Sequence, residues 1–149
     1  MNPQQFRIHI VEPTLKEIGL YSKSAEHLLM CTAAVESGFE YIQQIGGVAR
    51  GFFQMEPNTI RDLEANLSES KAKLLYKWKP ATLSCEGALR GCMEFMVVAA
   101  RLQYWRFPEP LPQIGDEDGF WRYYKKYWNT QDGATTEDKF FAACQKYLS

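Results

Sequence analysis

Apolar residues recur at helical spacing along most of this chain, and no other feature restricts its fold as strongly. In residues 24–37, one face of a helix would carry Ala25, Leu28, Leu29, Thr32 and Val35. Such a stripe is how an amphipathic helix packs against a core. The alternation typical of strands appears only weakly, at residues 48–55. We therefore expect an all-α fold, or nearly so, with at most a short β-hairpin.

The expected helices are separated by prolines, glycines and capping residues. Helical period is found in residues 6–20 with a bend or restart at Pro13, and in 24–37, 57–67, 69–78, 85–106, 119–129 and 135–148. Ser22 or Ser24, and Thr135 or Thr136, are placed to cap two of these helices through their hydroxyl oxygens. A length of 149 residues suits one domain, so we expect a single domain over residues 1–149.

Charge and cysteine content exclude several classes of protein. A net charge of −1 argues against a nucleic-acid-binding protein, and no apolar stretch approaches the ~20 residues of a membrane span. The N-terminus lacks the basic and apolar regions of a secretion signal. The histidines and cysteines do not have the spacing of a zinc site. We expect no metal, no other cofactor, and four buried free thiols.

Glu36 occupies an electrostatically unfavourable place. It falls in the last turn of the 24–37 helix, where the helix dipole disfavours an anion by ~0.3–1 kcal/mol. The residues before it, Cys31 to Val35, are small or apolar and indicate a buried helix end. Burial and the dipole both raise a carboxyl pKa, and glycosidic bond cleavage needs such a protonated acid. A lone glutamate at a helix end is nevertheless most often structural or solvated.

The surroundings of Glu36 form a recognisable pattern. Ser37 follows it directly, and after a glycine-rich connection comes Gly51-Phe52-Phe53-Gln54-Met55-Glu56-Pro57. A Glu-Ser pair at a helix end, followed by a glycine, two apolar residues and Gln-x-x-Pro, resembles the soluble lytic transglycosylase and goose-type lysozyme superfamily. The resemblance implies a lysozyme-like fold and cleavage of the MurNAc–GlcNAc bond in peptidoglycan glycan strands.

A second resemblance covers nearly the whole chain. The Glu36 segment is followed by residues 99–106 (AARLQYWR), a proline segment at 108–112 (PEPLP) and an aromatic segment at 121–130 (WRYYKKYWNT). These are similar to the corresponding segments of phage-encoded lysozyme-like proteins. This resemblance implies a protein of a phage particle, delivered to the host periplasm or present in the host cytoplasm before lysis, with other virion proteins as candidate partners.

The superfamily resemblance also implies roles for single residues. Glu36 would be the general acid and base, with Ser37 supporting it by capping or by a hydrogen bond near the sugar. The remaining substrate contacts would come from Gly51, Phe53, Gln54 and Tyr104. Gly51 would let the loop approach the saccharide closely. Tyr104 is the nearest substitute for the family's tyrosine opposite the glutamate, because this sequence lacks the Tyr-Asn-Ala-Gly run that usually carries it.

Two reactions stay open at this point. An inverting hydrolase needs a second carboxylate ~6.5–9.5 Å from the acid, whereas a lytic transglycosylase needs one carboxylate only. Glu40 and Glu56 are the nearby acids in the sequence. We expect Glu40 to be solvated and Glu56 to cap the next helix, which slightly favours the transglycosylase. A third alternative is a non-catalytic virion structural protein on a lysozyme-like scaffold.

The aromatic segment 119–129 has two interpretations. Its aromatic residues are Phe120, Trp121, Tyr123, Tyr124, Tyr127 and Trp128. Their helical spacing favours a core-packing stripe. The alternative is a sugar-stacking wall, with Arg122, Lys125 or Lys126 reaching carboxylates of the peptide stems, and different faces of one helix can serve both purposes.

Overall fold

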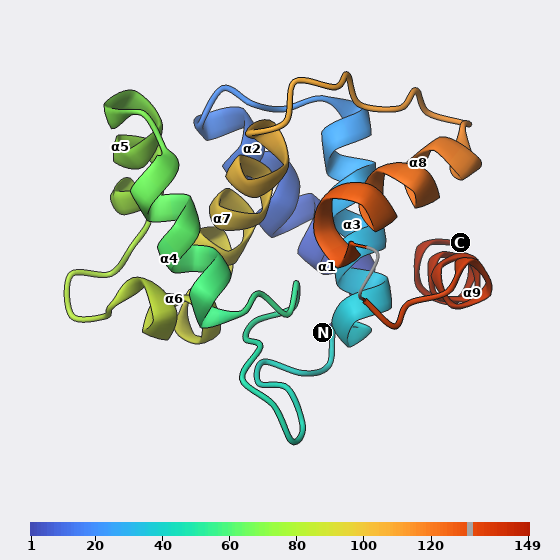
Figure 1. The fold of residues 1–149 in the computed structure, drawn as a ribbon, viewed down its shortest axis with the longest axis horizontal. Coiled ribbons are helices and arrows are strands. Elements are labelled where there is room, and N and C mark those ends of the chain that lie inside the picture. The colour runs from blue at the N-terminus through green and yellow to red at the C-terminus, as the bar shows by residue number, and fades with distance from the viewer. Residues whose placement is uncertain (131–132) are drawn as a thin grey trace.

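The computed structural model describes residues 1–130 and 133–149, and these form a bundle of helices (Figure 1). The helices are α1 (Pro3–Phe6), the π-helical turn η1 (Arg7–Val11), α2 (Glu12–Glu17), α3 (Lys23–Ser37), α4 (Pro57–Asn66), α5 (Glu69–Lys77), α6 (Cys85–Gly91), α7 (Met93–Trp105), α8 (Glu117–Tyr124), the π-helical turn η2 (Lys125–Asn129) and α9 (Glu137–Leu148). In the described residues no strand forms, and Arg50 makes only isolated bridges to Gln43 and Met55. The all-α prediction is confirmed.

Helix α7 is the centre of the core. It contacts α2, α3, α4, α5, α6 and η1, and its residues from Phe95 to Ala100 are each at most 2% exposed. A helix that is apolar on every side is stable only when other elements cover it completely. Over residues 1–130 and 133–149, no helix combines the length and the apolar character required to cross a membrane.

The expected helix over residues 85–106 is two helices, so that prediction was wrong. α6 ends at Gly91 and α7 begins at Met93, with Cys92 between them in an extended conformation (φ −140°, ψ 109°). Glycine lowers helix propensity, which makes this a weak point of the segment. The glycine-rich connection packs against this break between α6 and α7. Gly51 lies so close to it that a Cβ at this position would overlap the carbonyl oxygen of Leu89.

A π-helical turn precedes Pro13 in the N-terminal helical segment. Pro13 has no N–H and its ring crowds the preceding turn, which is why a bend or restart was expected. The wider turn η1 comes just before it, where Glu12 N–H bonds to the carbonyl of Arg7. The chain therefore stays helical from α1 to α2, and both Phe6 and Leu15 are buried.

Helix α3 ends where the candidate site begins. Its start is capped as predicted, by Ser22 Oγ accepting from Ala25 N–H at 3.0 Å. Its end is Gly38, whose left-handed backbone (φ 59°) suits glycine and reverses the chain direction. The connection to α4 then leaves the bundle as a long loop, drawn in teal below the helices in Figure 1. Glu36 thus lies at a corner between a buried helix and this loop.

Candidate active site

A cleft of about 540 Å³ opens at the C-terminal end of α3. Its lining comes from the end of α3, the connection to α4, the start of α4, α7, η2 and the segment after η2, and includes Glu36, Gln44, Gln54, Glu56, Thr59, Gln103, Tyr127, Trp128, Asn129 and Thr130. The volume lies within the range of small-molecule and saccharide-sized sites. Only the folded chain brings these segments together.

Glu36 is half-buried in the wall of this cleft. Burial raises the pKa of its carboxyl to about 7, while a hydrogen bond from Tyr124 acts in the opposite direction. The Tyr124 hydroxyl donates to Glu36 Oε1 at 3.1 Å. The last turn of α3, described in full, contains no basic residue. With burial as the main influence on its pKa, the carboxyl is protonated in a large fraction of molecules near neutral pH.

Tyr124 is the partner of Glu36 that sequence reasoning missed. It is fully buried in α8, and its hydroxyl also lies 3.3 Å from Thr135 Oγ1. Burial and the neighbouring Glu36 raise its pKa far above the usual range, so the phenol remains a donor. The sequence offers one weak signal for this role, namely that Tyr124 places a hydroxyl group within the apolar stripe of residues 119–129. Its place opposite Glu36 follows only from the packing of α8 against α3.

Tyr104 does not occupy the predicted place opposite Glu36. It is 1% exposed, and its hydroxyl lies 2.8 Å from Thr32 Oγ1 within the core. Its ring packs against Trp128 with ring centroids 5.1 Å apart. The face of the last turns of α7 that carries Tyr104 packs against α3 and η2. The structure therefore puts Tyr124, and not Tyr104, in contact with the candidate acid.

Ser37 ties the end of α3 to the connection. Its hydroxyl donates to the carbonyl of Phe52 at 2.6 Å and accepts from Phe39 N–H at 3.1 Å. The side chain is buried. Of the two roles considered, the structure favours local support of the helix end over a contact with the sugar, and this support fixes the backbone beside Glu36.

The three other predicted residues of the loop differ in position. Gly51 is buried at the α6–α7 break with φ +76°, and Phe53 is buried between Phe6 and Trp128. Gln54 lines the cleft, and its Nε2 donates to Gly51 O at 2.9 Å. Its backbone is left-handed (φ 50°), a strained conformation for a residue other than glycine that is concentrated at functional sites. Of these three, Gln54 alone is placed to touch a ligand in the cleft.

Of the two candidate second carboxylates, Glu56 lines the cleft and Glu40 does not. Glu56 is the N-cap residue of α4, as expected, but it caps through its backbone carbonyl and its side chain makes no capping hydrogen bond. Glu40 is exposed on the loop, outside the residues that line the cleft. Within residues 1–130 and 133–149, no three acids, histidines or cysteines are grouped as a metal site. Glu56 is thus the acid that shares the cleft with Glu36.

The aromatic residues of the segment 119–129 are divided between the core and the cleft. Phe120 and Tyr124 are buried in the core, while Tyr127 and Trp128 line the cleft.

Lys125 has a structural role in place of the expected contact with the carboxylates of a peptide stem. Its Nζ donates to Asn129 Oδ1 at 2.7 Å, to Gly133 O at 3.0 Å and to Thr135 O at 3.2 Å. This holds the segment that supports Tyr124.

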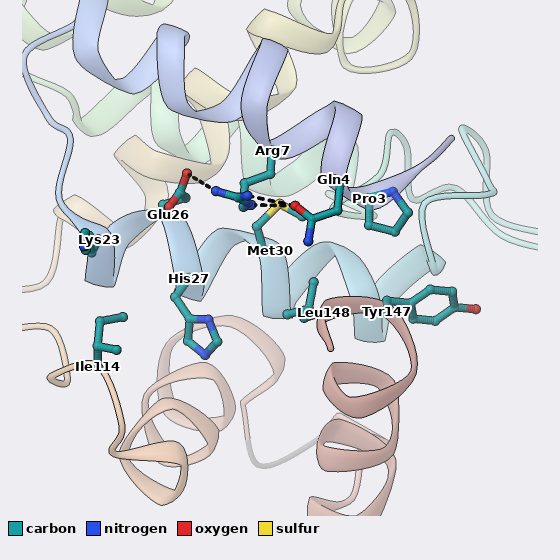
Figure 2. Close-up of a pocket in the computed structure, with 10 residues that line it drawn as sticks. All are labelled: Pro3, Gln4, Arg7, Lys23, Glu26, His27, Met30, Ile114, Tyr147 and Leu148. Carbon is teal, nitrogen blue, oxygen red and sulfur yellow. Dashed lines mark hydrogen bonds and ion pairs between the residues drawn. The ribbon is translucent and has the colours of Figure 1, made fainter.

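A second cavity, of about 330 Å³, lies between the N-terminal helices, α3 and α9 (Figure 2). It contains a carboxylate as well, Glu26, but this acid forms an ion pair with Arg7 at 3.6 Å. Arg7 is held in turn by Gln4 Oε1 at 2.8 Å. Because its buried acid is paired with a cation, this cavity lacks the free acid that distinguishes the cleft of Glu36.

We compared the chain with protein-family models, with curated proteins and with solved structures, and none of the three comparisons found a match. The motif around Glu36 and the geometry of the cleft are therefore the features of this chain that bear on its function.

Proposed function

We propose that this chain is a lysozyme-like, peptidoglycan-degrading enzyme that cleaves the MurNAc–GlcNAc bond with Glu36 as general acid and base. One observation carries the proposal: a carboxyl with a pKa of about 7, in a helix turn that contains no basic residue, stands in the wall of an open cleft. An acid catalyst works best when its pKa is close to the working pH. Burial also raises the pKa of the acid in well-known glycosidases.

The rest of the lining is suited to a glycan. Gln54, Gln103 and Asn129 supply amide groups that donate to and accept from sugar hydroxyls. Tyr127 and Trp128 supply aromatic surface. The ring of Tyr127 stacks on that of Phe107, with the ring centroids 4.3 Å apart. A saccharide presents hydroxyls at its edge and C–H groups on its faces, so a cleft with both kinds of group matches it.

The chemistry would begin with protonated Glu36. It gives its proton to the glycosidic oxygen, and the bond to the sugar breaks through an oxocarbenium-like transition state. The Tyr124 hydroxyl, already donating to Oε1, stabilises the carboxylate that remains. That carboxylate then takes a proton either from the 6-hydroxyl of the same sugar, which closes a 1,6-anhydro ring, or from water. Hydrolysis by inversion would require Glu56 to activate the water.

Digestion of purified peptidoglycan tests this proposal. We expect clearing by the wild-type protein, none by Glu36→Gln, and wild-type clearing by Glu40→Gln as the matched loop control. Mass spectrometry of the products separates the reactions, because 1,6-anhydro ends indicate a transglycosylase and reducing ends a hydrolase. Glu56→Gln should abolish hydrolysis that proceeds by inversion and should leave the formation of 1,6-anhydro ends intact. A folded wild-type protein that clears nothing would contradict the proposal and favour a virion structural protein.

The similarity of residues 99–130 to phage proteins supports a wider proposal about where the enzyme works. We place it in a phage particle that opens the host wall, or in the infected cell before lysis, with other virion proteins as partners. Immunoblotting of purified particles tests this placement independently of catalysis.

A further inference from the structure

A third cavity, of about 480 Å³, lies at the C-terminal end of α7, beside the proline segment that follows this helix. Its lining comes from α7, from residues 106–111 and from Tyr123 of α8. Trp105, Phe107 and Leu111 give this lining a large apolar part. Arg101 of α7 also lines the cavity and is half-buried. The cavity therefore combines an apolar wall with a cationic side chain.

The other charged side chains of this lining are neutralised, but Arg101 is not. Arg106 pairs with Asp62 at 2.9 Å, and Glu109 pairs with Lys126 at 3.3 Å. Over residues 1–130 and 133–149, Arg101 forms no ion pair. The cavity thus has one uncompensated positive charge among the residues that the structure describes.

The guanidinium of Arg101 is fixed in place and partly removed from water. Its Nε donates to the carbonyl oxygen of Leu20 at 3.1 Å, which anchors the side chain. In the described part of the chain, its two Nη atoms donate to no acceptor. Burial lowers the pKa of Arg101 below its usual range. Because a desolvated charge is costly without an opposite charge nearby, an anion that enters the cavity would stabilise this group.

One aromatic ring separates this cavity from the cleft of Glu36. Tyr127 lines the cleft, and its ring contacts two residues that line the cavity. Phe107 stacks on it with the ring centroids 4.3 Å apart, and Tyr123 meets it edge to face at 4.7 Å. A ligand that occupies the cleft can therefore extend past Tyr127 into the cavity.

We propose that this cavity binds the peptide stem of the peptidoglycan strand in the cleft, with Arg101 forming an ion pair with a stem carboxylate. The inference rests on the proposed function, because it assigns a site to a further part of the same substrate. A stem offers carboxylates to the guanidinium and methyl groups to the apolar wall, so it matches both parts of the lining. Arg101 would determine specificity and would take no part in bond cleavage.

The polar groups around Arg101 leave the carboxylate to this residue. A guanidinium presents its N–H groups in a planar fork, and the two Nη atoms that remain can hold both oxygens of one carboxylate. The Tyr123 hydroxyl is already used, because it donates to the carbonyl oxygen of Glu109 at 2.9 Å. Lys71 Nζ lies 4.5 Å from the ring centre of Trp105, which adds positive charge beside the cavity.

The assignment differs from the one that the sequence suggested. Arg122, Lys125 or Lys126 was expected to reach the stem carboxylates. Lys125 is instead bonded to oxygens of its own segment, and Lys126 is paired with Glu109. Arg101 was not a candidate, because its position beside the aromatic segment depends on the packing of α7 and α8.

Cleavage of soluble glycan oligosaccharides that differ only in their stems tests the proposal. Three substrates are compared: one with free stems, one with the stem carboxylates converted to amides, and one from which an amidase has removed the stems. For the wild-type protein, we expect the KM for free stems to be about tenfold lower than for amidated stems. The KM for the stripped substrate should be at least as high as for the amidated one, and kcat should be similar for all three.

Arg101→Gln should raise the KM for free stems to the value for amidated stems and should leave kcat unchanged. It should treat the stripped substrate as the wild type does, which also shows that the variant is folded. Arg101→Lys keeps the charge but loses the fork, so its KM should lie between the two. Arg90→Gln is the matched control, because Arg90 is exposed on α6 and lines neither the cleft nor this cavity.

Two results would overturn the proposal: equal losses by Arg101→Gln on all three substrates, or a wild type that treats free and amidated stems alike. Failure of the proposed function gives a different result, a folded wild type that cleaves none of the substrates. Calorimetry on the Glu36→Gln protein then decides about the cavity without cleavage. Adding Arg101→Gln should weaken binding of the stem-bearing oligosaccharide about tenfold, and equal affinities would contradict the inference.

Discussion

The two ends of α3 each carry a desolvated carboxylate, but the fold treats them differently. Glu26 lies in the first turn, where the helix dipole favours an anion, and Arg7 lies 3.6 Å away. Glu36 lies in the last turn, where the dipole opposes an anion, and its partner is the neutral hydroxyl of Tyr124 at 3.1 Å. Burial raises the pKa of both groups, and at Glu26 the charge of Arg7 opposes that rise.

The difference shows what separates a structural acid from a candidate catalytic one on the same helix. Burial alone does not make a carboxyl useful as an acid, because a nearby cation restores the ionised form. Glu36 combines burial with the absence of a cation from its own helix end and with an open cleft. Each of these features can be changed singly, and the changes below run from the largest expected effect to the smallest.

The first test exchanges each acid for its amide. Glu36→Gln should lower the rate of peptidoglycan cleavage by roughly 10²–10⁴-fold, because an amide cannot donate the proton that the leaving oxygen needs. Turbidity clearing and product analysis measure this. Glu26→Gln, the matched change at the other end of α3, should leave the rate unchanged. Equal losses in both variants would break the distinction between the two ends.

The second test uses the pH dependence of stability. The folded-state pKa of Glu36 is raised from 4.5 to about 7, so the folded protein binds this proton more tightly than the unfolded chain. The contribution of this group to stability is therefore fully present below pH ~4.5 and is lost as the pH rises to about 7.

The size of that loss is at most about 3 kcal/mol and is reduced where water in the cleft reaches the carboxyl. Urea unfolding at several pH values, in the wild type and in Glu36→Gln, measures it. The free energies of unfolding should be similar at acidic pH, and the variant should become relatively more stable toward pH 8. A constant difference between the two proteins at every pH would contradict the raised pKa.

The third test removes the neutral partner of Glu36. Tyr124→Phe deletes the hydrogen bond that lowers the Glu36 pKa, so that pKa should rise further. The alkaline limb of the kcat/KM profile should then move to higher pH. The loss of one hydrogen bond, ~0.5–1.5 kcal/mol, predicts a two- to tenfold lower rate at the optimum. Tyr104→Phe is the matched control, and an equal change in both variants would contradict the assignment of Tyr124.

The fourth test removes the cation from the other end of the helix. Arg7→Met should raise the pKa of Glu26, because the guanidinium lowers it in the wild type. The ion pair is partly exposed, so the free energy of unfolding should fall by only about 1 kcal/mol or less at neutral pH. Chemical denaturation measures this effect. Peptidoglycan cleavage should be retained, and its loss would show that the two ends of α3 are not independent.

Local chemistry was sufficient to predict much of this molecule. The apolar period predicted α3, α4, α5 and α9 within a few residues of their observed bounds, and Ser22 and Thr136 cap as their side chains suggest. The small and apolar residues before Glu36 indicated a desolvated helix end, and the structure shows burial as the main cause of its raised pKa. These features depend on residues within one or two turns of each other.

Contacts between distant segments could not be predicted in this way. The break at Cys92 depends on Gly51 packing against the α6–α7 junction from the loop, and the partner of Glu36 depends on α8 lying across α3. Helical periodicity predicts which face of each helix is apolar, but Tyr104 and Tyr124 both lie on such a face, so periodicity does not show which of them contacts Glu36. Packing decides between them: Tyr104 lies on a face of α7 that is buried in the core, whereas the end of α8 brings the Tyr124 hydroxyl to Glu36.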